Sequence, residues 1–320
     1  CNKKNPVFMR VLAFRKRLEE KRKERRGTGM ISSKRKFSVG MRARRKLDTV
    51  IFHVVVGGVA IFMIYPLVWM LLSSFKPTDK VMTTVTQLIP DVWTIQNYIT
   101  GWKGFGGITF ATFFKNSLII TILSTIGAVL SSTMVAYGFA RINFRFKKAL
   151  FFCMIITMML PGQVIMIPQY IIFNKLGWVN TMLPIVVPSW FAKAFFIFMI
   201  MQFIEGIPKD LDEAALMDGC SNYSIFTSII VPLVRPAMVT CAIFEFYWKW
   251  DDYMSSLLYL NTPKNYTVSI ALKNFTDPMS SSDFGAMFAM CVLSLLPVIT
   301  IFLLLQKYIV EGVAASGIKG

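Results

Sequence analysis

The stretch VIFHVVVGGVAIFMIYPLVWMLL, residues 50–72, is 23 residues long and contains no Asp, Glu, Lys or Arg. A helix that crosses the hydrocarbon core of a bilayer needs about 20 predominantly apolar residues. This stretch therefore predicts a transmembrane helix. Five similar runs follow it, so the sequence predicts an all-α membrane protein with six transmembrane helices: Val50–Leu72, Ser117–Ala140, Ala149–Phe173, Thr181–Phe203, Ile229–Trp248 and Phe284–Leu305.

The composition agrees with a membrane protein and excludes several other classes. Of the 320 residues, 55% are hydrophobic and only 16% are charged, whereas a soluble domain averages about 25% charged residues. His53 is the only histidine, and the five cysteines show neither metal-site nor disulfide spacing. A histidine-based catalytic or metal centre is therefore excluded. No glycine-rich loop that ends in Lys-Ser or Lys-Thr occurs, so we expect no ATPase site in this chain.

The net charge of +18 is concentrated at the N-terminus. Residues 1–48 contain 18 basic and 4 acidic residues, whereas the remaining 272 contain 17 basic and 13 acidic residues. The sequence thus predicts three regions: a basic tail at 1–48, a transmembrane domain at 49–308 and a C-terminal end at 309–320. We expect the tail to be attracted to anionic lipid, and we expect no nucleic-acid partner.

Short loops predict the orientation in the membrane. Residues 141–148 contain four basic residues, whereas residues 174–180 on the opposite side contain only Lys175. Basic loops stay in the cytoplasm, so both termini are predicted to be cytoplasmic. With six spans, the same rule places the loop 205–228 inside and the loops 76–116 and 249–283 outside.

The inner loop contains the most informative motif, IPKDLDEAALMDGC, at residues 207–220. Asp210 is a good N-cap residue, and Glu213 has the position that completes a capping box. Gly219 is suited to end the helix in the left-handed conformation. Ser221 or Asn222 can then cap a second helix. We therefore expect a short helix, a sharp turn and a second helix at the membrane surface.

This loop resembles a known signature. Glu213-Ala214-Ala215-x-x-Asp218-Gly219, followed by Phe226, Ile229, Pro232 and Pro236, is similar to the EAA motif of ABC importer permeases. Residues 47–320 resemble the maltose-type and multiple-sugar permeases in particular, through Tyr65-Pro66-Leu67, Ala136-Tyr137-Gly138-Phe139-Ala140-Arg141, Pro161-Gly162-Gln163-Val164 and the ending Gly317-Ile318-Lys319-Gly320.

The resemblance implies a function for the chain as one subunit of a larger assembly. In that family the loop is a coupling helix that docks into a cleft of a separate ATPase, which implies coupling roles for Glu213, Ala214, Ala215, Asp218, Gly219, Phe226 and Pro232. The implied partners are two ATPase subunits, a second and different permease, an extracytoplasmic solute-binding protein and an oligosaccharide. This chain would bind no cofactor itself, since ATP and Mg²⁺ belong to the ATPase. The implied location is a bacterial or archaeal cytoplasmic membrane.

Four residues are candidates for the substrate pathway: Lys193 near the middle of the fourth predicted span, and Glu245, Trp248 and Trp250 at the outer end of the fifth. A charge inside a membrane is expensive and normally faces a cavity or a partner. Lys193 and Glu245 can therefore form a structural pair or contribute to the pathway. The aromatic residues fit an interfacial belt or a stacking surface for sugar rings.

Three alternatives remain open at this stage. The first is a permease of the same fold for a non-sugar solute, such as a polyamine or a phosphate ester. The second is an ion-coupled secondary transporter, which should show repeated halves or a relay of intramembrane carboxylates. The third is a membrane-tethered interaction protein that uses the basic tail.

Overall fold

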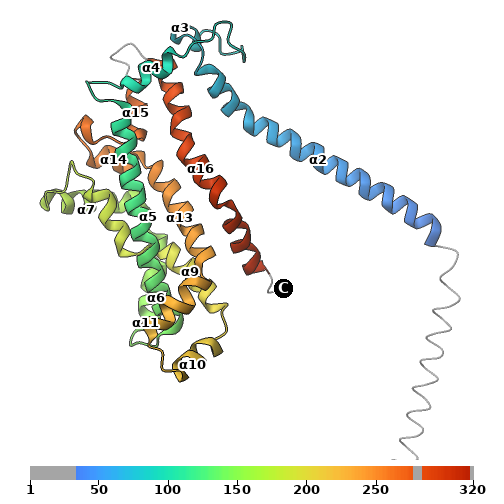
Figure 1. Cartoon of the computed structure of the whole chain (residues 1–320), viewed down its shortest axis with the longest axis vertical. Helices are drawn as coiled ribbons and strands as arrows, with labels where there is room; N and C mark the ends of the chain where they lie inside the picture. The colour runs from blue at the N-terminus through green and yellow to red at the C-terminus, as the bar shows by residue number, and fades with distance from the viewer. Residues whose placement is uncertain (1–33, 277–282, 318–320) are drawn as a thin grey trace, which may run out of the picture. The chain divides into compact units, whose positions relative to one another are not determined.

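The computed structural model describes residues 34–276 and 283–317, in which every named element is helical (Figure 1). Most of the predicted basic tail, residues 1–33, lies outside the described residues, as do 277–282 of the outer loop and 318–320 at the C-terminus. The chain divides into two units, Cys1–Val68 and Trp69–Gly320. We call the described part of the second unit the bundle.

The first unit is dominated by one long helix. Helix α2 (Lys34–Ser73) is continuous over 40 residues, and Asp48–Ser73 within it is apolar and long enough to cross a membrane. The predicted span Val50–Leu72 is therefore confirmed as a helix of sufficient length. The helix also extends into the basic region, because residues 34–48 continue it without a break.

The bundle contains the remaining helices of residues 34–276 and 283–317, most of them short. They are α3 (Thr78–Val81), α4 (Gln96–Lys103), α5 (Phe110–Arg141), α6 (Lys147–Met159), α7 (Gly162–Lys175), α8 (Leu183–Val186), the 3₁₀-helix η1 (Val187–Phe191), α9 (Ala194–Glu205), α10 (Asp210–Met217), α11 (Asn222–Ile225), the π-helix η2 (Phe226–Ile230), α12 (Val231–Leu233), α13 (Arg235–Trp250), α14 (Tyr253–Tyr259), the 3₁₀-helix η3 (Pro263–Asn265), α15 (Val268–Asn274) and α16 (Phe284–Gly317).

The predicted spans fall into two groups. Four are single stretches that are long and apolar enough to cross a membrane: Asp48–Ser73, Phe110–Arg141, Leu183–Glu205 and Phe284–Tyr308. The other two are bent pairs of helices, Lys147–Met159 with Gly162–Lys175, and Asn222–Leu233 with Arg235–Trp250. Six spans result if each bent pair counts as one.

The predicted third span is not one continuous helix but two helices with a sharp bend between them. Helices α6 and α7 meet at an angle of 101°, and Leu160 between them has an extended backbone (φ −79°, ψ 122°). Pro161 lacks a backbone N–H and cannot continue the ladder of α6. Since the 13 residues of α6 reach about 20 Å, they are too short to cross the hydrocarbon core alone.

The predicted fifth span is broken as well. The segment Asn222–Leu233 meets α13 at 73°, with Val234 at the junction. Pro236 occupies the first turn of α13, where its missing N–H is tolerated. This bend at Val234 separates the part of the chain that follows the motif loop from the part that contains Glu245.

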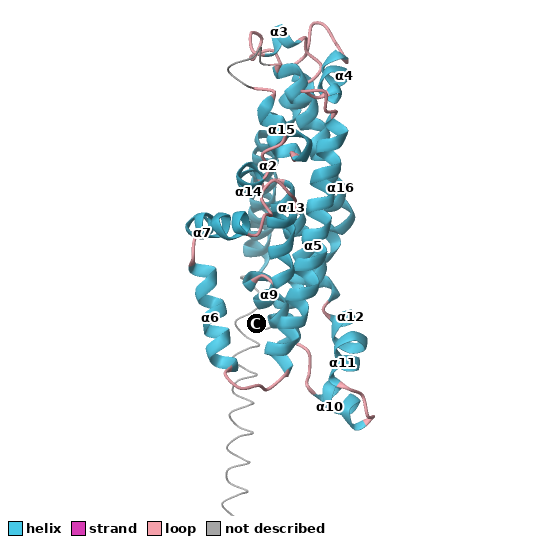
Figure 2. Cartoon of the chain, turned by 90° about the vertical axis from the view of Figure 1, so that its left-hand side faces the viewer, coloured by secondary structure: helices cyan, strands magenta, loops and turns pink. Residues whose placement is uncertain are grey.

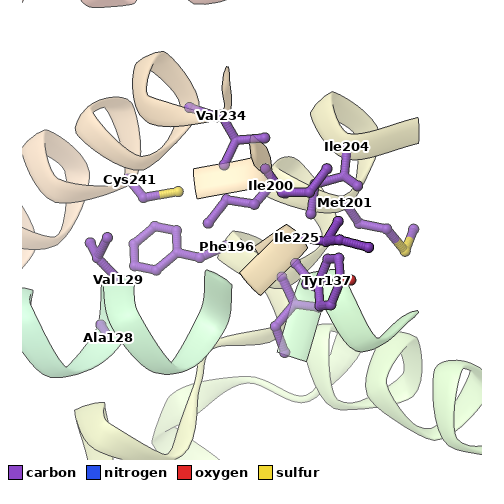
Figure 3. Close-up of a cluster of buried hydrophobic side chains, with 14 of the residues drawn as sticks. Ala128, Val129, Tyr137, Phe196, Ile200, Met201, Ile204, Ile225, Val234 and Cys241 are labelled. Carbon is purple, nitrogen blue, oxygen red and sulfur yellow. The ribbon is translucent and has the colours of Figure 1, made fainter. Parts of the chain in front are cut away.

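Helix α5 is central to the bundle. It packs along α9 and α13, and α13 packs in turn along α16. In both views α10 lies at one end of the bundle and α3 and α4 lie at the other (Figures 1 and 2). One buried cluster joins α5, α9, α11 and α13 at the α10 end, where Tyr137, Phe196, Ile204 and Ile225 lie close together (Figure 3). A second cluster joins α5, α13, α15 and α16.

The part of the predicted outer loop 249–283 that the structure describes up to residue 276 is itself folded. It contains α14, η3 and α15, which are tied to earlier parts of the chain. Asn116 donates from its side chain to the carbonyls of Lys264 and Tyr266, at 2.9 and 3.0 Å. The Asn180 carboxamide oxygen accepts the N–H groups of Asn261 and Thr262. This packing makes the segment part of the bundle rather than a free connection.

Candidate functional site

The motif loop forms the predicted short helix and turn, but the helix begins differently. Lys209, with helical backbone angles, is the N-cap, and its carbonyl accepts the N–H groups of Asp212 and Glu213 at 2.9 and 3.1 Å. The predicted capping box of Asp210 and Glu213 is therefore wrong, because the backbone is already helical one residue earlier. Asp210, Asp212 and Glu213 instead place negative charge in the first turn, where the helix dipole favours it.

The end of α10 is formed as predicted. Gly219 has a φ of +82°, the left-handed conformation that glycine adopts without steric cost. The Cys220 N–H bonds to the Ala215 carbonyl and the Gly219 N–H bonds to the Leu216 carbonyl, both at 3.0 Å. These two bonds are the Schellman motif. Ser221 then caps α11 by accepting the Ser224 N–H at 3.2 Å, which confirms the predicted second cap.

The predicted coupling residues lie on two sides of the loop. Ala215 is buried in the cluster at this end of the bundle, and Phe226 is half-buried with its ring 5.1 Å from that of Tyr137. The others are exposed: Glu213, Ala214, Asp218, Gly219 and Pro232. Met217 is 86% exposed. The loop therefore has an inner side that packs on the bundle and an outer side that is free in this chain.

Three residues that the motif did not single out fasten this loop to α5. Arg141 Nε lies 2.7 Å from Asp212 Oδ2, and their side chains are only 6% and 15% exposed. Arg141 Nη2 also donates to the Ile207 carbonyl at 2.7 Å. One turn earlier on α5, the Tyr137 hydroxyl donates to the Asn222 carbonyl at 3.2 Å. In the sequence, Arg141 stood out as a basic loop residue and as the end of the Ala136–Arg141 motif, whereas no role was predicted for Asp212.

The two intramembrane charges form an ion pair. Lys193 Nζ lies 2.8 and 2.6 Å from the two Glu245 carboxylate oxygens, which joins α13 to the residue that precedes α9. The Ser189 hydroxyl donates to the same carboxylate at 3.3 Å. The Glu245 side chain is fully buried, whereas that of Lys193 is 31% exposed. The structural pair that the sequence offered as one of two interpretations is thus formed. Its ammonium group is partly exposed on the surface of this chain.

Lys193 lies where the Leu183–Glu205 span is locally not helical. Ala192 has a φ of +61°, uncommon for a residue with a Cβ, and Lys193 is extended (φ −114°, ψ 127°). The freed N–H groups of Ala192 and Lys193 are accepted by the hydroxyls of Ser131 and Ser132 on α5, both at 3.0 Å. We call residues 192 and 193 the break.

The two candidate tryptophans have different environments. The Trp248 ring stacks on Phe196 at 5.6 Å, and Lys193 Nζ lies 6.0 Å from its centroid, so Trp248 belongs with the ion pair. Trp250 is 7% exposed and donates from its indole N–H to the Ser294 carbonyl of α16 at 3.1 Å. Trp250 therefore packs α13 against α16, and the structure does not support its assignment to the substrate pathway.

Within residues 34–276 and 283–317, no group of three or more His, Cys, Asp or Glu side chains is placed to hold a metal ion. The candidate site instead consists of the partly exposed loop around α10 at one end of the bundle and, further along it, the Lys193–Glu245 pair with the stacked rings of Phe196 and Trp248. Both are joined to α5. This arrangement is suited to transmit movement and to line a path.

A family model described as a binding-protein-dependent transport system inner membrane component matches residues 128–314. The chain belongs to this family. It is a multi-pass permease subunit of a binding-protein-dependent ABC importer in the inner membrane, and it is not a catalytic subunit. The matched residues include the EAA motif, the break and Glu245.

Individual relatives agree with this assignment. The probable ABC transporter permease YurM of Bacillus subtilis is 33% identical over 257 residues, which cover 80% of this permease and 84% of that protein. The arabinooligosaccharides transport system permease AraQ of Halalkalibacterium halodurans and the trehalose/maltose transport system permease MalG of Thermococcus litoralis are each 30% identical, over 82% of this permease and 93% of their own lengths.

A solved structure supports the fold. A chain in the crystal structure of a bacterial ABC transporter involved in the import of the acidic polysaccharide alginate matches with a TM-score of 0.72 and 21% sequence identity. The match covers 82% of this permease and 96% of that chain. Since the identity is low, this match is evidence for a shared fold only.

Proposed function

We propose that this permease imports oligosaccharides and that its 205–228 loop couples the transport path to a separate ATPase. The observation that carries the coupling role is the two-sided α10 helix. Its Ala215 side is buried in the bundle, whereas Glu213, Ala214 and Met217 are exposed. A short helix on a fixed base, with small and charged exposed residues, can dock into a cleft without rearranging.

The mechanism follows from the division of labour between subunits. Two ATPase subunits bind and hydrolyse ATP, and a second, different permease supplies the other half of the path. Closure of the ATPases moves α10 and biases the spans between two states, with access from one side or the other. A solute-binding protein delivers the substrate at the face that contains residues 76–116 and 249–283.

The sidedness belongs to the same proposal: both termini and α10 lie in the cytoplasm. We call residues 207–222 the α10 loop. The support for this sidedness is that the basic segment 141–148 and the α10 loop lie at the same end of the bundle, since Arg141 contacts Asp212. Basic segments of this kind favour the cytoplasmic side. An impermeant thiol reagent tests this in a variant without native cysteines. Lys264→Cys should react from outside intact cells, whereas Asp218→Cys should react only after permeabilisation.

We assign Lys193, Glu245 and Trp248 to the substrate path. A partly exposed ammonium in a span is expensive against lipid, which favours a wet or protein-covered face. Trp248 is 44% exposed beside it, and an aromatic face of this kind can stack on a sugar ring. Trp248→Ala should lower solute uptake with the amount of inserted permease unchanged. Unchanged uptake with a lower membrane yield would instead indicate an interfacial belt residue.

The coupling role is tested by Gly219→Val. A β-branched residue is strained at a φ of +82° by roughly 1–2 kcal/mol, so the turn after α10 should change shape. We expect normal insertion and loss of solute-stimulated ATP hydrolysis in vesicles that contain the complete transporter. Gly219→Asn is the matched control, because Asn tolerates this conformation. Normal stimulation in Gly219→Val would contradict the proposal.

The substrate class is tested separately by uptake. Vesicles with the complete transporter and its binding protein should accumulate a labelled neutral oligosaccharide in an ATP-dependent way. Its support is that the relatives AraQ and MalG are permeases of transport systems for arabinooligosaccharides and for trehalose/maltose. Uptake of a polyamine or a phosphate ester in place of any oligosaccharide would overturn the substrate class and leave the coupling role intact.

A further inference from the structure

Two side chains of α5 hold both ends of the α10 loop. Arg141 contacts the start of the loop, at the Ile207 carbonyl and the Asp212 carboxylate. Tyr137 contacts the end of the loop, at the Asn222 carbonyl. Since Tyr137 and Arg141 are four residues apart, they lie on the same face of α5. We call these contacts the clamp.

The clamp is a separate attachment from the chain itself. The loop is covalently continuous with α9 at one end and with α11 at the other, so movement of α10 reaches those helices directly. Helix α5 is not a sequence neighbour of the loop, since 71 residues separate Arg141 from Asp212. Apolar packing also joins this part of the chain to α5, since the Phe226 ring lies 5.1 Å from that of Tyr137, and Ala215 and Ile225 belong to the same buried cluster as Tyr137.

The same helix also holds the break. Ser131 and Ser132 of α5 accept the N–H groups of Ala192 and Lys193. Ser132 lies nine residues before Arg141, which is about 14 Å along a helix that rises 1.5 Å per residue. The uninterrupted α5 helix thus contacts the loop at one level and the non-helical residues beside the Lys193–Glu245 pair at another.

We propose that α5 transmits movement of the α10 loop to the break, and that Arg141 is the positioning residue that fixes the loop to α5. This inference rests on the proposed docking of α10 with the ATPase. The Arg141 guanidinium holds the loop through an ion pair with the Asp212 carboxylate and a hydrogen bond to the Ile207 carbonyl, a combination that a neutral side chain does not reproduce. When α10 moves, α5 follows, and the hydroxyls of Ser131 and Ser132 move with it.

The experiment is a double-mutant cycle in the complete transporter, reconstituted in vesicles. Arg141→Gln, Asp212→Asn and the double variant are compared by the ratio of solute-stimulated to basal ATP hydrolysis. We expect each single variant to lose about tenfold in this ratio, within the range typical of coupling between sites. We expect the double variant to lose no more than Arg141→Gln, because the two residues act through one contact.

Two further variants separate the clamp from general destabilisation. Arg145→Gln is the matched control, since Arg145 is exposed and has no ion pair within the described part of the chain; its ratio should equal that of the wild type. Tyr137→Phe keeps the ring against Phe226 and removes only the hydroxyl contact. We expect Tyr137→Phe to lower the ratio of solute-stimulated to basal ATP hydrolysis by about two- to threefold, which is less than the roughly 5–150-fold typical of coupling between sites.

The outcomes distinguish the clamp from the docking role. All variants should retain the ATPase subunit during purification in detergent. Unchanged ratios in Arg141→Gln and Asp212→Asn, or losses that multiply in the double variant, would overturn the clamp. Loss of the ATPase from Asp212→Asn would also overturn it, because Asp212 would then act in docking. If Gly219→Val keeps normal stimulation, it is the docking role that fails, whatever the cycle gives.

Discussion

One ion pair joins the α10 loop to α5 and another joins the break to α13, but the two pairs differ in what surrounds them. Arg141 and Asp212 lie at one end of the bundle, and both side chains are largely buried. Lys193 and Glu245 lie within the spans, where the carboxylate is fully buried and the ammonium is partly exposed. An unpaired charge at the end of the bundle can reach water by a small movement, whereas one inside a span cannot. The first pair therefore mainly positions a loop, and the second also governs stability.

The largest expected effect is at Glu245. Glu245→Gln leaves the Lys193 ammonium without its counter-charge, and breaking a buried pair in this way costs about 3–5 kcal/mol. We expect a sharp drop in the thermal unfolding temperature of the permease in detergent and in its yield. The double variant Lys193→Met with Glu245→Gln should recover much of the loss. Equal stability of the single and double variants would show that the pair is not what holds α13 at the break.

The break should also respond to glycine. Ala192 has a positive φ, and conformations of this kind cost about 1–3 kcal/mol for residues with a Cβ. Ala192→Gly should therefore raise the stability by about 1 kcal/mol after the added freedom of the unfolded chain is subtracted. Ala242→Gly is the control, since the same change inside α13 should lower stability by about 0.5–1 kcal/mol. A loss at both positions would contradict strain at the break.

The smallest expected effect is in the α10 loop. Ser221 caps α11 with its side chain, so Ser221→Ala should cost about 1 kcal/mol. Asp210 makes no capping bond at the start of α10, so Asp210→Ala should lose only the weaker interaction with the helix dipole, about 0.3–1 kcal/mol. Both are read from thermal unfolding. A larger loss for Asp210→Ala would restore the capping box that the structure does not show.

The sequence predicted the elements of both regions better than their connections. Apolar runs located the spans, and turn chemistry located Gly219 and Ser221, because these signals are local. The sequence predicted one span at Ala149–Phe173 but not its 101° bend at Pro161, since a proline breaks a helix without specifying the angle. The Asp210 cap failed because Lys209 adopts helical angles that residue type alone does not reveal.

The contacts between distant residues were the hardest to predict. The Lys193–Glu245 pair was one of two open interpretations, because a charge in a span requires a partner but does not name it. The Arg141–Asp212 pair was missed, since Arg141 is equally consistent with a topology signal. Trp250 was grouped with Trp248 by sequence proximity, yet residues two apart on a helix face different directions. Each of these cases depends on which side chains meet in three dimensions.

The docking of α10 with a separate ATPase is the central claim, and cross-linking tests it most directly. In a functional variant without native cysteines, Met217→Cys places a thiol on the exposed side of α10, and Ala215→Cys places one on the buried side. In membranes that contain the whole transporter, a short thiol-to-amine cross-linker should join the ATPase subunit to the Met217→Cys permease and not to the Ala215→Cys permease. Absence of an ATPase adduct from Met217→Cys, or equal adducts from both positions, would contradict the account.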